Sequence, residues 1–283
     1  MSTILSNRVQ KVKPSATMAV SDKAKELKSQ GIQIISMGSG EPDFDTPVNI
    51  QKAAITAIGS GDTRYTPADG TAELKKAVCE KFKRENGLDY SLNEVMVSCG
   101  GKQVFYNLCQ AILNEGDEVI IPTPYWVSYP DMAILADATP VFIEAGLEQD
   151  FKITPDQLEA SITNKSKLFV LNSPSNPTGS VYSESEIKAL GEVLKKYPHV
   201  LTISDDIYEH IRWGDDDFVN IAMACPELKD RVVILNGVSK AYAMTGWRIG
   251  YAAGPETVIK AMKKIQGQST SNPSSISQAA ALE

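Results

Sequence analysis

Short apolar runs alternate with helical patterns along most of this chain. Six of them, rich in valine, isoleucine and leucine, lie between residues 94 and 236: EVMVSC, DEVIIP, TPVFIE, KLFVLN, HVLTIS and RVVILN. Most of these runs follow a segment with helical periodicity. Strands that alternate with helices in this way form a largely parallel sheet with helices on both faces. We therefore predict a three-layer α/β/α sandwich with a mostly parallel sheet.

Helix boundaries can also be predicted from single residues. The segment MAVSDKAKELKSQG is expected to form a helix that ends at Gly31. Pro47 is expected at the start of a second helix. A third helix should begin after Thr71 and end at Gly87, because threonine and glycine favour helix starts and ends. The apolar run IQIISM, residues 32–37, predicts a further strand.

The composition excludes several classes of function. The 283 residues carry a net charge of −7 and a pI near 5.1, unlike the basic surface of nucleic-acid-binding proteins. No apolar run approaches the length of about 18 residues that a membrane helix needs. The four cysteines form no CxxC pair, which is typical of reduced thiols in a cytoplasmic protein. With only two histidines, His199 and His210, we expect no metal site.

Polar and aromatic residues follow the predicted strands. Gly101 and Lys102 follow EVMVSC and begin a helix, where free backbone N–H groups can bind an anion. Trp126 follows DEVIIP, and Asn176 lies on a turn after KLFVLN. Asp205 follows HVLTIS, and RVVILN leads to Lys240. Ligands of such sheets bind at the carboxyl ends of the strands, so these side chains are candidates for one site.

Each of these residues alone has an ordinary structural explanation, such as a plain turn or core packing. Together they match the requirements of one cofactor, pyridoxal phosphate. That cofactor needs a lysine amine, a carboxylate against its ring nitrogen and an anion site for its phosphate. Arg248, eight residues after Lys240, adds a cation for the phosphate, and an aromatic side chain could stack on the flat ring.

The chain resembles the fold-type I, pyridoxal-phosphate-dependent aminotransferases, most closely the bacterial aspartate aminotransferase branch. Seven stretches in the family's order, between residues 38 and 251, carry the resemblance: GSGEPDFDTP, RYTPADG, GGKQ, PYWVSYP, NSPSNPTG, SDDIYEH and SKAYAMTGWRIGY. With the N-terminal helix, the resemblance extends over essentially the whole chain. Seven ordered motifs make a specific signal.

The resemblance implies a role for each matching residue around the ring. Lys240 matches the catalytic lysine, which binds the cofactor covalently and moves the substrate's proton. Asp205 matches the carboxylate that keeps the pyridine nitrogen protonated, and Tyr208 and Asn176 match the donors to the phenolic oxygen. Trp126 matches the aromatic side chain that stacks on the ring. Trp126 and Asn176 are expected to border the substrate as well.

The resemblance also implies which residues bind the phosphate and the substrate. Gly101 and Lys102 match the phosphate-binding turn, and Arg248 matches the phosphate-binding arginine. Tyr65 matches a tyrosine that reaches the phosphate of a neighbouring subunit, so a homodimer is expected. Gly40 matches the glycine whose backbone contacts the α-carboxylate of the substrate.

Two departures from the family pattern stand out. Gly237 lies three residues before Lys240, where many relatives carry a serine or threonine that binds phosphate. Family chains also continue into a small C-terminal domain with the arginine that binds the substrate α-carboxylate. This chain is expected to lack that domain. We expect an N-terminal arm and helix over residues 1–45 and a cofactor-binding large domain over 46–283.

The expected reaction is transfer of an amino group between an L-amino acid, foremost aspartate, and 2-oxoglutarate. Other reactions fit the same residues: those of an aromatic, alanine or prephenate aminotransferase, or of a β-lyase. A fragment that binds the cofactor without turnover is a further alternative. Amino acids and 2-oxo acids are the expected partners, with no nucleic acid and no membrane.

Overall fold

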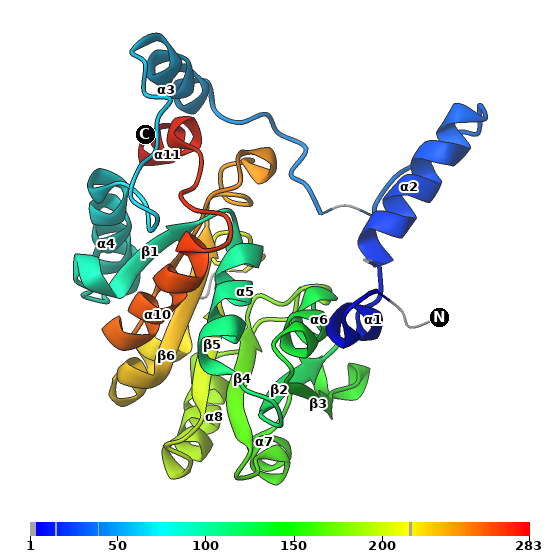
Figure 1. Cartoon of the computed structure of the whole chain (residues 1–283). Coiled ribbons are helices and arrows are strands. Elements are labelled where there is room, and N and C mark those ends of the chain that lie inside the picture. The colour runs from blue at the N-terminus through cyan, green and yellow to red at the C-terminus, as the bar shows by residue number, and fades with distance from the viewer. Residues whose placement is uncertain (1–3, 15, 39, 215–216) are drawn as a thin grey trace.

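One sheet of seven strands forms the centre of the protein in the computed structural model (Figure 1). The structure describes residues 4–14, 16–38, 40–214 and 217–283. The strands, in the sheet order β1-β7-β6-β5-β4-β2-β3, are β1 (Val95–Ser98), β7 (Gly250–Ala253), β6 (Val232–Gly237), β5 (Leu201–Asp205), β4 (Ser166–Asn172), β2 (Glu118–Thr123) and β3 (Thr139–Glu144). Only β7 pairs antiparallel with its neighbours in this sheet. The prediction of a mostly parallel sheet is therefore confirmed.

Two hydrophobic cores lie on opposite faces of the sheet. Successive strand residues point to opposite faces, so Ile120 belongs to one core, whereas Val119 and Ile121 belong to the other. Because both faces are buried, the strands read as continuous apolar runs rather than as alternating ones. This arrangement confirms the three-layer α/β/α architecture.

The helices complete the two outer layers. Those of the first core include α4 (Ala72–Asn86), α7 (Pro155–Ser161), α8 (Glu184–Lys196), α9 (Ile221–Ala224) and α11 (Ser275–Leu282). Those of the second core are α5 (Gly101–Ile112), α6 (Ser128–Leu135) and α10 (Glu256–Gly267). Figure 1 shows α5 and α10 side by side across one face of the sheet. Within the described ranges, no helix has the length and apolar character needed to cross a membrane.

The predicted helix boundaries agree closely with the structure. The Thr71 hydroxyl accepts a hydrogen bond from the Leu74 N–H at the start of α4, and Gly87 ends that helix at φ 66°. A positive φ favours glycine because the residue has no Cβ. Pro47 directly precedes α3 (Val48–Gly59).

The N-terminal segment carries α1 (Asn7–Lys11) and α2 (Ala16–Ser29), and α2 stands apart from the sheet in Figure 1. The strand predicted for residues 32–37 is wrong, because this segment has no regular structure. Ile35 and Met37 are largely exposed. A strand needs a hydrogen-bonded neighbour, and this apolar run pairs with no strand of the described sheet. The division into an arm over 1–45 and a domain over 46–283 stays a prediction.

Candidate active site

The carboxyl ends of β1, β4, β5 and β6 meet at one edge of the sheet, together with the amino end of β7. Asn172, the last residue of β4, pairs with Asp205, the last residue of β5, which in turn pairs with Leu235 on β6. Gly250, at the start of β7, pairs with Ser98 on one side and with Gly237 on the other. This register places the segments after β1, β4, β5 and β6 side by side, as expected for a ligand site of an open α/β sheet.

Asp205 is a buried carboxyl group at this edge, with 4% of its surface exposed. Its Oδ2 accepts a hydrogen bond of 2.5 Å from the Tyr129 hydroxyl, and its Oδ1 accepts one of 3.3 Å from the Ile207 N–H. Burial raises the pKa of Asp205 to about 6, although both hydrogen bonds act in the opposite direction. A cationic group placed beside Asp205 would therefore favour its ionised form.

Tyr129 is a residue that the sequence prediction missed. Its ring is buried between Phe105, at 4.9 Å between centroids, and Trp126, at 5.2 Å and nearly perpendicular. Both Tyr129 and Trp126 belong to the stretch PYWVSYP, three residues apart. That spacing brings side chains to one face of a helical turn, and it was the available signal for a second functional residue there.

Lys240 lies on the turn that follows β6, and its Nζ donates a hydrogen bond to the Gly40 carbonyl oxygen. Nζ is also 5.8 Å from the centroid of the Tyr208 ring. Burial lowers the pKa of Lys240; the Glu41 carboxylate opposes this shift, and Arg248 adds to it. The structure thus brings together two of the candidate residues, Gly40 and Lys240.

Tyr208 and Asn176 form a pair of polar groups beside this lysine. The Asn176 Nδ2 donates to the Tyr208 hydroxyl at 3.3 Å, and the Asn176 backbone N–H donates to the Asn172 Oδ1 at 2.8 Å. Burial and the negative charge of Asp205 raise the pKa of Tyr208, whereas the Asn176 hydrogen bond lowers it. Tyr208 therefore remains a hydrogen-bond donor at neutral pH.

The turn at Gly100 and Gly101, at the start of α5, lies close to Arg248 and Gly250. Gly100 has a φ of 86°, and a Cβ on it would lie 2.2 Å from the Arg248 Nη2. A Cβ on Gly250 would lie 2.4 Å from the Gly101 backbone nitrogen. Position 100 requires glycine because of its positive φ, and position 250 because a Cβ would collide with the Gly101 backbone. The N-terminus of α5 and the Arg248 guanidinium are thereby held together, and both attract anions.

Arg248 and Lys102 are the cations of this turn. The Arg248 Nη2 donates to the Cys99 carbonyl oxygen at 3.3 Å, and its Nη1 donates to that of Thr245 at 2.8 Å. Lys102 Nζ is 5.2 Å from the centroid of the Trp126 ring. Burial and then the nearby Arg248 charge lower the pKa of Lys102. An anion bound between the two cations would relieve this repulsion.

Tyr65 stands apart from the other candidate residues, with 93% of its surface exposed. The turn that carries it is nevertheless fixed. The buried Gln266 donates from Nε2 to the Ala68 carbonyl oxygen at 2.5 Å, and Gln278 donates to the Thr66 hydroxyl at 3.0 Å. A rigid turn thus presents an exposed tyrosine, which within this chain is separate from the buried group around Asp205.

Gly237 has a clear structural reason to be glycine. A Cβ at this position would lie 2.9 Å from the Ile249 carbonyl oxygen and 3.0 Å from the Gly250 Cα. Both contacts are with backbone, which cannot move aside as a flexible side chain could. The serine or threonine of many relatives would therefore require a shift of β7 in this chain.

A cluster of carboxyl and imidazole groups lies on the α4 side of the sheet. The ligand atoms of Glu85, Glu209 and His210 lie within 4.8 Å of one another. However, the Lys81 ammonium forms ion pairs with both carboxylates, so their charge already has a counter-ion. We assign no metal to this cluster.

Known proteins match this chain over nearly its whole length. The family model for aminotransferase class I and II matches residues 32–283. The aspartate/prephenate aminotransferase of Nitrosomonas europaea is 61% identical over 277 residues, 98% of this chain and 70% of that protein. A probable aspartate/prephenate aminotransferase of Rickettsia bellii is 59% identical over 281 residues, 99% of this chain and 70% of that protein. The chain belongs to the class I and II aminotransferase family.

Solved structures agree with this membership. The aspartate aminotransferase of Rhizobium meliloti superposes with a TM-score of 0.96 at 49% identity, over 99% of this chain and 70% of that one. The Thermus thermophilus aspartate aminotransferase with maleate gives a TM-score of 0.95 at 45% identity, over 99% of this chain and 72% of that one. The aminotransferase fold and family predicted from the seven motifs are thereby confirmed.

Aminotransferases of this family depend on pyridoxal phosphate, and the chemistry of the site fits that group. A buried carboxylate can face a ring nitrogen, and a lysine of lowered pKa can bind a carbonyl carbon. A helix N-terminus beside an arginine can hold a phosphate. Each charged part of the cofactor thus has a complementary group at this edge.

We predict that the chain without cofactor loses stability, relative to an Asp205→Asn variant, as the pH rises from about 4 to about 6. The Asp205 pKa is raised from 3.8 to about 6 in the folded state, so in this window the folded chain binds more protons than the unfolded chain. Ionisation therefore disfavours folding, by roughly 3 kcal/mol across the window.

Urea unfolding of both proteins at pH values between 4 and 7 measures this difference, with the exposed Asp62→Asn as the control substitution. A free-energy difference that is constant with pH, or that grows in favour of the unsubstituted chain, would contradict the buried carboxyl group described here.

Proposed function

We propose that this chain is an aminotransferase that takes its amino group from L-aspartate and passes it to a 2-oxo acid such as 2-oxoglutarate. Two relatives at 61% and 59% identity, one of them described as probable, are named for aspartate and prephenate, so prephenate is a second candidate acceptor. The observation that carries the proposal is the convergence of Lys240, Asp205 and the Arg248 turn at one edge of the sheet.

Lys240 is the proposed catalytic residue. Bound pyridoxal phosphate supplies an electron-withdrawing ring that stabilises negative charge on the substrate Cα. Lys240, whose pKa is lowered by burial, is proposed to take the Cα proton of the substrate and to return it. Gly40, whose carbonyl oxygen accepts from Nζ, is proposed to orient the amine and to border the substrate's α-carboxylate.

Asp205, Tyr208, Asn176 and Trp126 are the proposed ring-binding residues. The Asp205 carboxylate would hold the proton on the ring nitrogen, and the Tyr129 hydrogen bond fixes its orientation. The Tyr208 hydroxyl and the Asn176 Nδ2 would donate to the ring oxygen. Trp126 would stack on the ring, with its own orientation fixed by the perpendicular Tyr129. Trp126 and Asn176 are also the side chains that would border the substrate.

Gly101, Lys102 and Arg248 are the proposed phosphate site. Backbone N–H groups at the start of α5 would donate to the phosphate, and the Arg248 guanidinium could bind it through two parallel hydrogen bonds. The lowered pKa of Lys102 would rise again beside the phosphate charge.

We predict that Lys240→Ala abolishes turnover of aspartate with 2-oxoglutarate and removes the visible absorption of covalently bound cofactor. The alanine side chain can neither bind the carbonyl carbon nor carry the proton. The control is Lys264→Ala, which removes an exposed lysine of α10. Steady-state transamination over a panel of amino donors measures the loss and the donor preference together. Turnover by Lys240→Ala that matches the control would contradict the assignment, and preference for a donor other than aspartate would contradict the proposed substrate.

We also propose that the chain acts as a homodimer, in which Tyr65 reaches the phosphate of the second subunit. The proposal is supported by the exposure of Tyr65 on a turn that two buried glutamines hold in place. A symmetric dimer lets each copy of the turn serve the other copy's site.

A cytoplasmic location is proposed as well, since all four cysteines are free thiols.

We predict that mixing Lys240→Ala with Tyr65→Phe restores part of the activity that both variants lack alone. In a mixed dimer, one site combines an intact lysine from one chain with an intact tyrosine from the other. Activity of the mixture is measured after subunit exchange and is compared with that of each variant alone at the same total protein concentration. A mixture no more active than its parts, together with a monomeric mass in solution, would contradict the shared site.

A further inference from the structure

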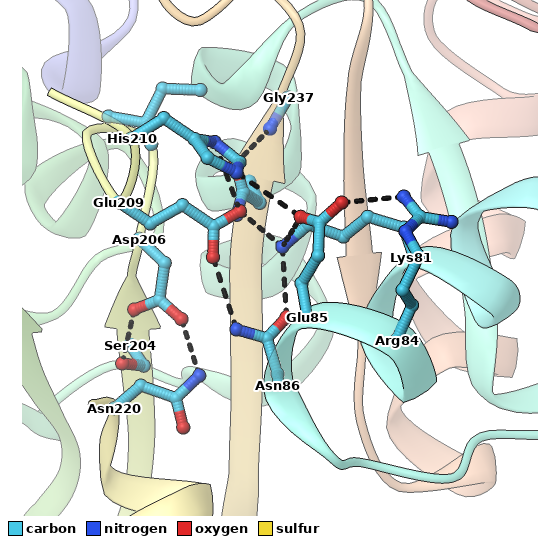
Figure 2. A network of polar contacts seen from close by, with 12 residues as sticks. Lys81, Arg84, Glu85, Asn86, Ser204, Asp206, Glu209, His210, Asn220 and Gly237 are labelled. Atoms are coloured by element: carbon cyan, nitrogen blue, oxygen red, sulfur yellow. Dashed lines mark hydrogen bonds and ion pairs between the residues drawn. The ribbon is translucent and has the colours of Figure 1, made fainter. Parts of the chain in front are cut away.

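Glu209, the residue after Tyr208, has a buried carboxylate with a full set of partners (Figure 2). Only 4% of its surface is exposed. Its Oε1 forms an ion pair with the Lys81 ammonium and accepts a hydrogen bond of 2.8 Å from the Asn236 Nδ2. Its Oε2 accepts a hydrogen bond of 3.2 Å from the Asn86 Nδ2. None of these groups belongs to the proposed cofactor or substrate contacts.

The carboxylate joins three segments that are distant in sequence. Lys81 and Asn86 come from α4, Glu209 from the turn after β5, and Asn236 from the end of β6. The Asn236 Oδ1 also accepts a hydrogen bond of 2.7 Å from the N–H of Gly237, the last residue of β6 before the turn that carries Lys240. One buried anion thus connects the segment that carries Tyr208 to the strand that leads to Lys240.

The turn is held at its other end by a second buried carboxyl group. The Asp206 carboxyl group accepts hydrogen bonds of 2.6 Å from the Ser204 hydroxyl and of 2.7 Å from the Asn220 Nδ2, as Figure 2 shows. The Asp206 N–H donates to the Leu235 carbonyl oxygen, and the Glu209 N–H donates to that of Asp206, both at 2.9 Å. Tyr208 therefore lies between two residues whose side chains are each fixed to the protein interior.

A buried ion pair is an unusual way to fix a turn. Removing two charges from water costs several kcal/mol per ion, and apolar side chains of similar size often stabilise a fold as well or better. What the buried ion pair provides is a fixed geometry, because a carboxylate held by three donors has little freedom to move. Such a group is suited to holding a neighbouring side chain in one orientation.

We propose that Glu209 is a positioning residue for the cofactor site, one that holds the Tyr208 hydroxyl at the place where it meets Asn176 and the ring oxygen. The inference rests on the proposed function. Glu209 touches neither cofactor nor substrate and acts through Tyr208, with the Asn236 link fixing the approach to Lys240.

The test is the dissociation constant of pyridoxal phosphate, measured by titration of the cofactor-free chain, together with the urea midpoint of each variant. We expect Glu209→Gln to raise this constant about tenfold, the scale of one lost hydrogen bond to a charged group. The control is Leu158→Ala on α7, which truncates a fully buried side chain in the core away from the strand ends. It lowers stability and should change the constant less than about threefold.

A double-mutant cycle separates positioning from general stability. If Glu209 acts through Tyr208, adding Glu209→Gln to a Tyr208→Phe background should weaken cofactor binding by less than about threefold, because the hydroxyl is already gone. A paired Lys81→Gln/Glu209→Gln variant leaves no unmatched buried charge and keeps the test valid if the single variant folds poorly. It is expected to weaken binding as Glu209→Gln does.

An equal effect of Glu209→Gln in both backgrounds, or an effect no larger than that of Leu158→Ala, would overturn the inference. Failure of the unsubstituted chain to bind pyridoxal phosphate at all would instead overturn the proposed function itself. A normal affinity of the unsubstituted chain with no change in either Glu209 variant would overturn the positioning role alone.

Discussion

The parallel pairing of β4, β5 and β6 is the constraint on which the site depends. Because Asn172, Asp205 and Leu235 are successive partners across three strands, the segments that follow them leave the sheet at the same edge. Tyr208, Asn176 and Lys240 all lie on those segments. A slip in register by one residue would move every side chain of a strand to the other face of the sheet, so that the packing of both cores would be lost and the site residues would be separated.

The neighbouring residues Asp205 and Asp206 both lie at this edge, but their carboxyl groups have different partners and different roles. Asp205 has Tyr129 of α6 as its partner, whereas Asp206 binds Ser204 and Asn220. Burial raises the pKa of both groups. Both groups accept hydrogen bonds at both oxygens, but Asp206 fixes the turn, whereas Asp205 lies beside the aromatic side chains of Trp126 and Tyr129.

The sequence predicted the parallel sheet because its buried strands are continuous apolar runs, and it predicted α4 because Thr71 and Gly87 are strong boundary signals. It predicted a strand over 32–37 wrongly, because a short apolar run alone does not show whether a neighbouring strand exists to pair with it. Tyr129 and Glu209 were missed for another reason. Their partners, Asp205 for one and Lys81 and Asn236 for the other, are distant in sequence, and only the folded chain brings them together.

The central claim is that this edge of the sheet binds pyridoxal phosphate through Lys240. The most direct measurement is reduction of the cofactor-loaded protein with borohydride, followed by proteolysis and mass spectrometry of the labelled peptide. We predict a single modified peptide that contains Lys240, because its amine has a pKa lowered by burial and lies beside Tyr208. Label on Lys102, label spread over exposed lysines, or no label at all would contradict the account.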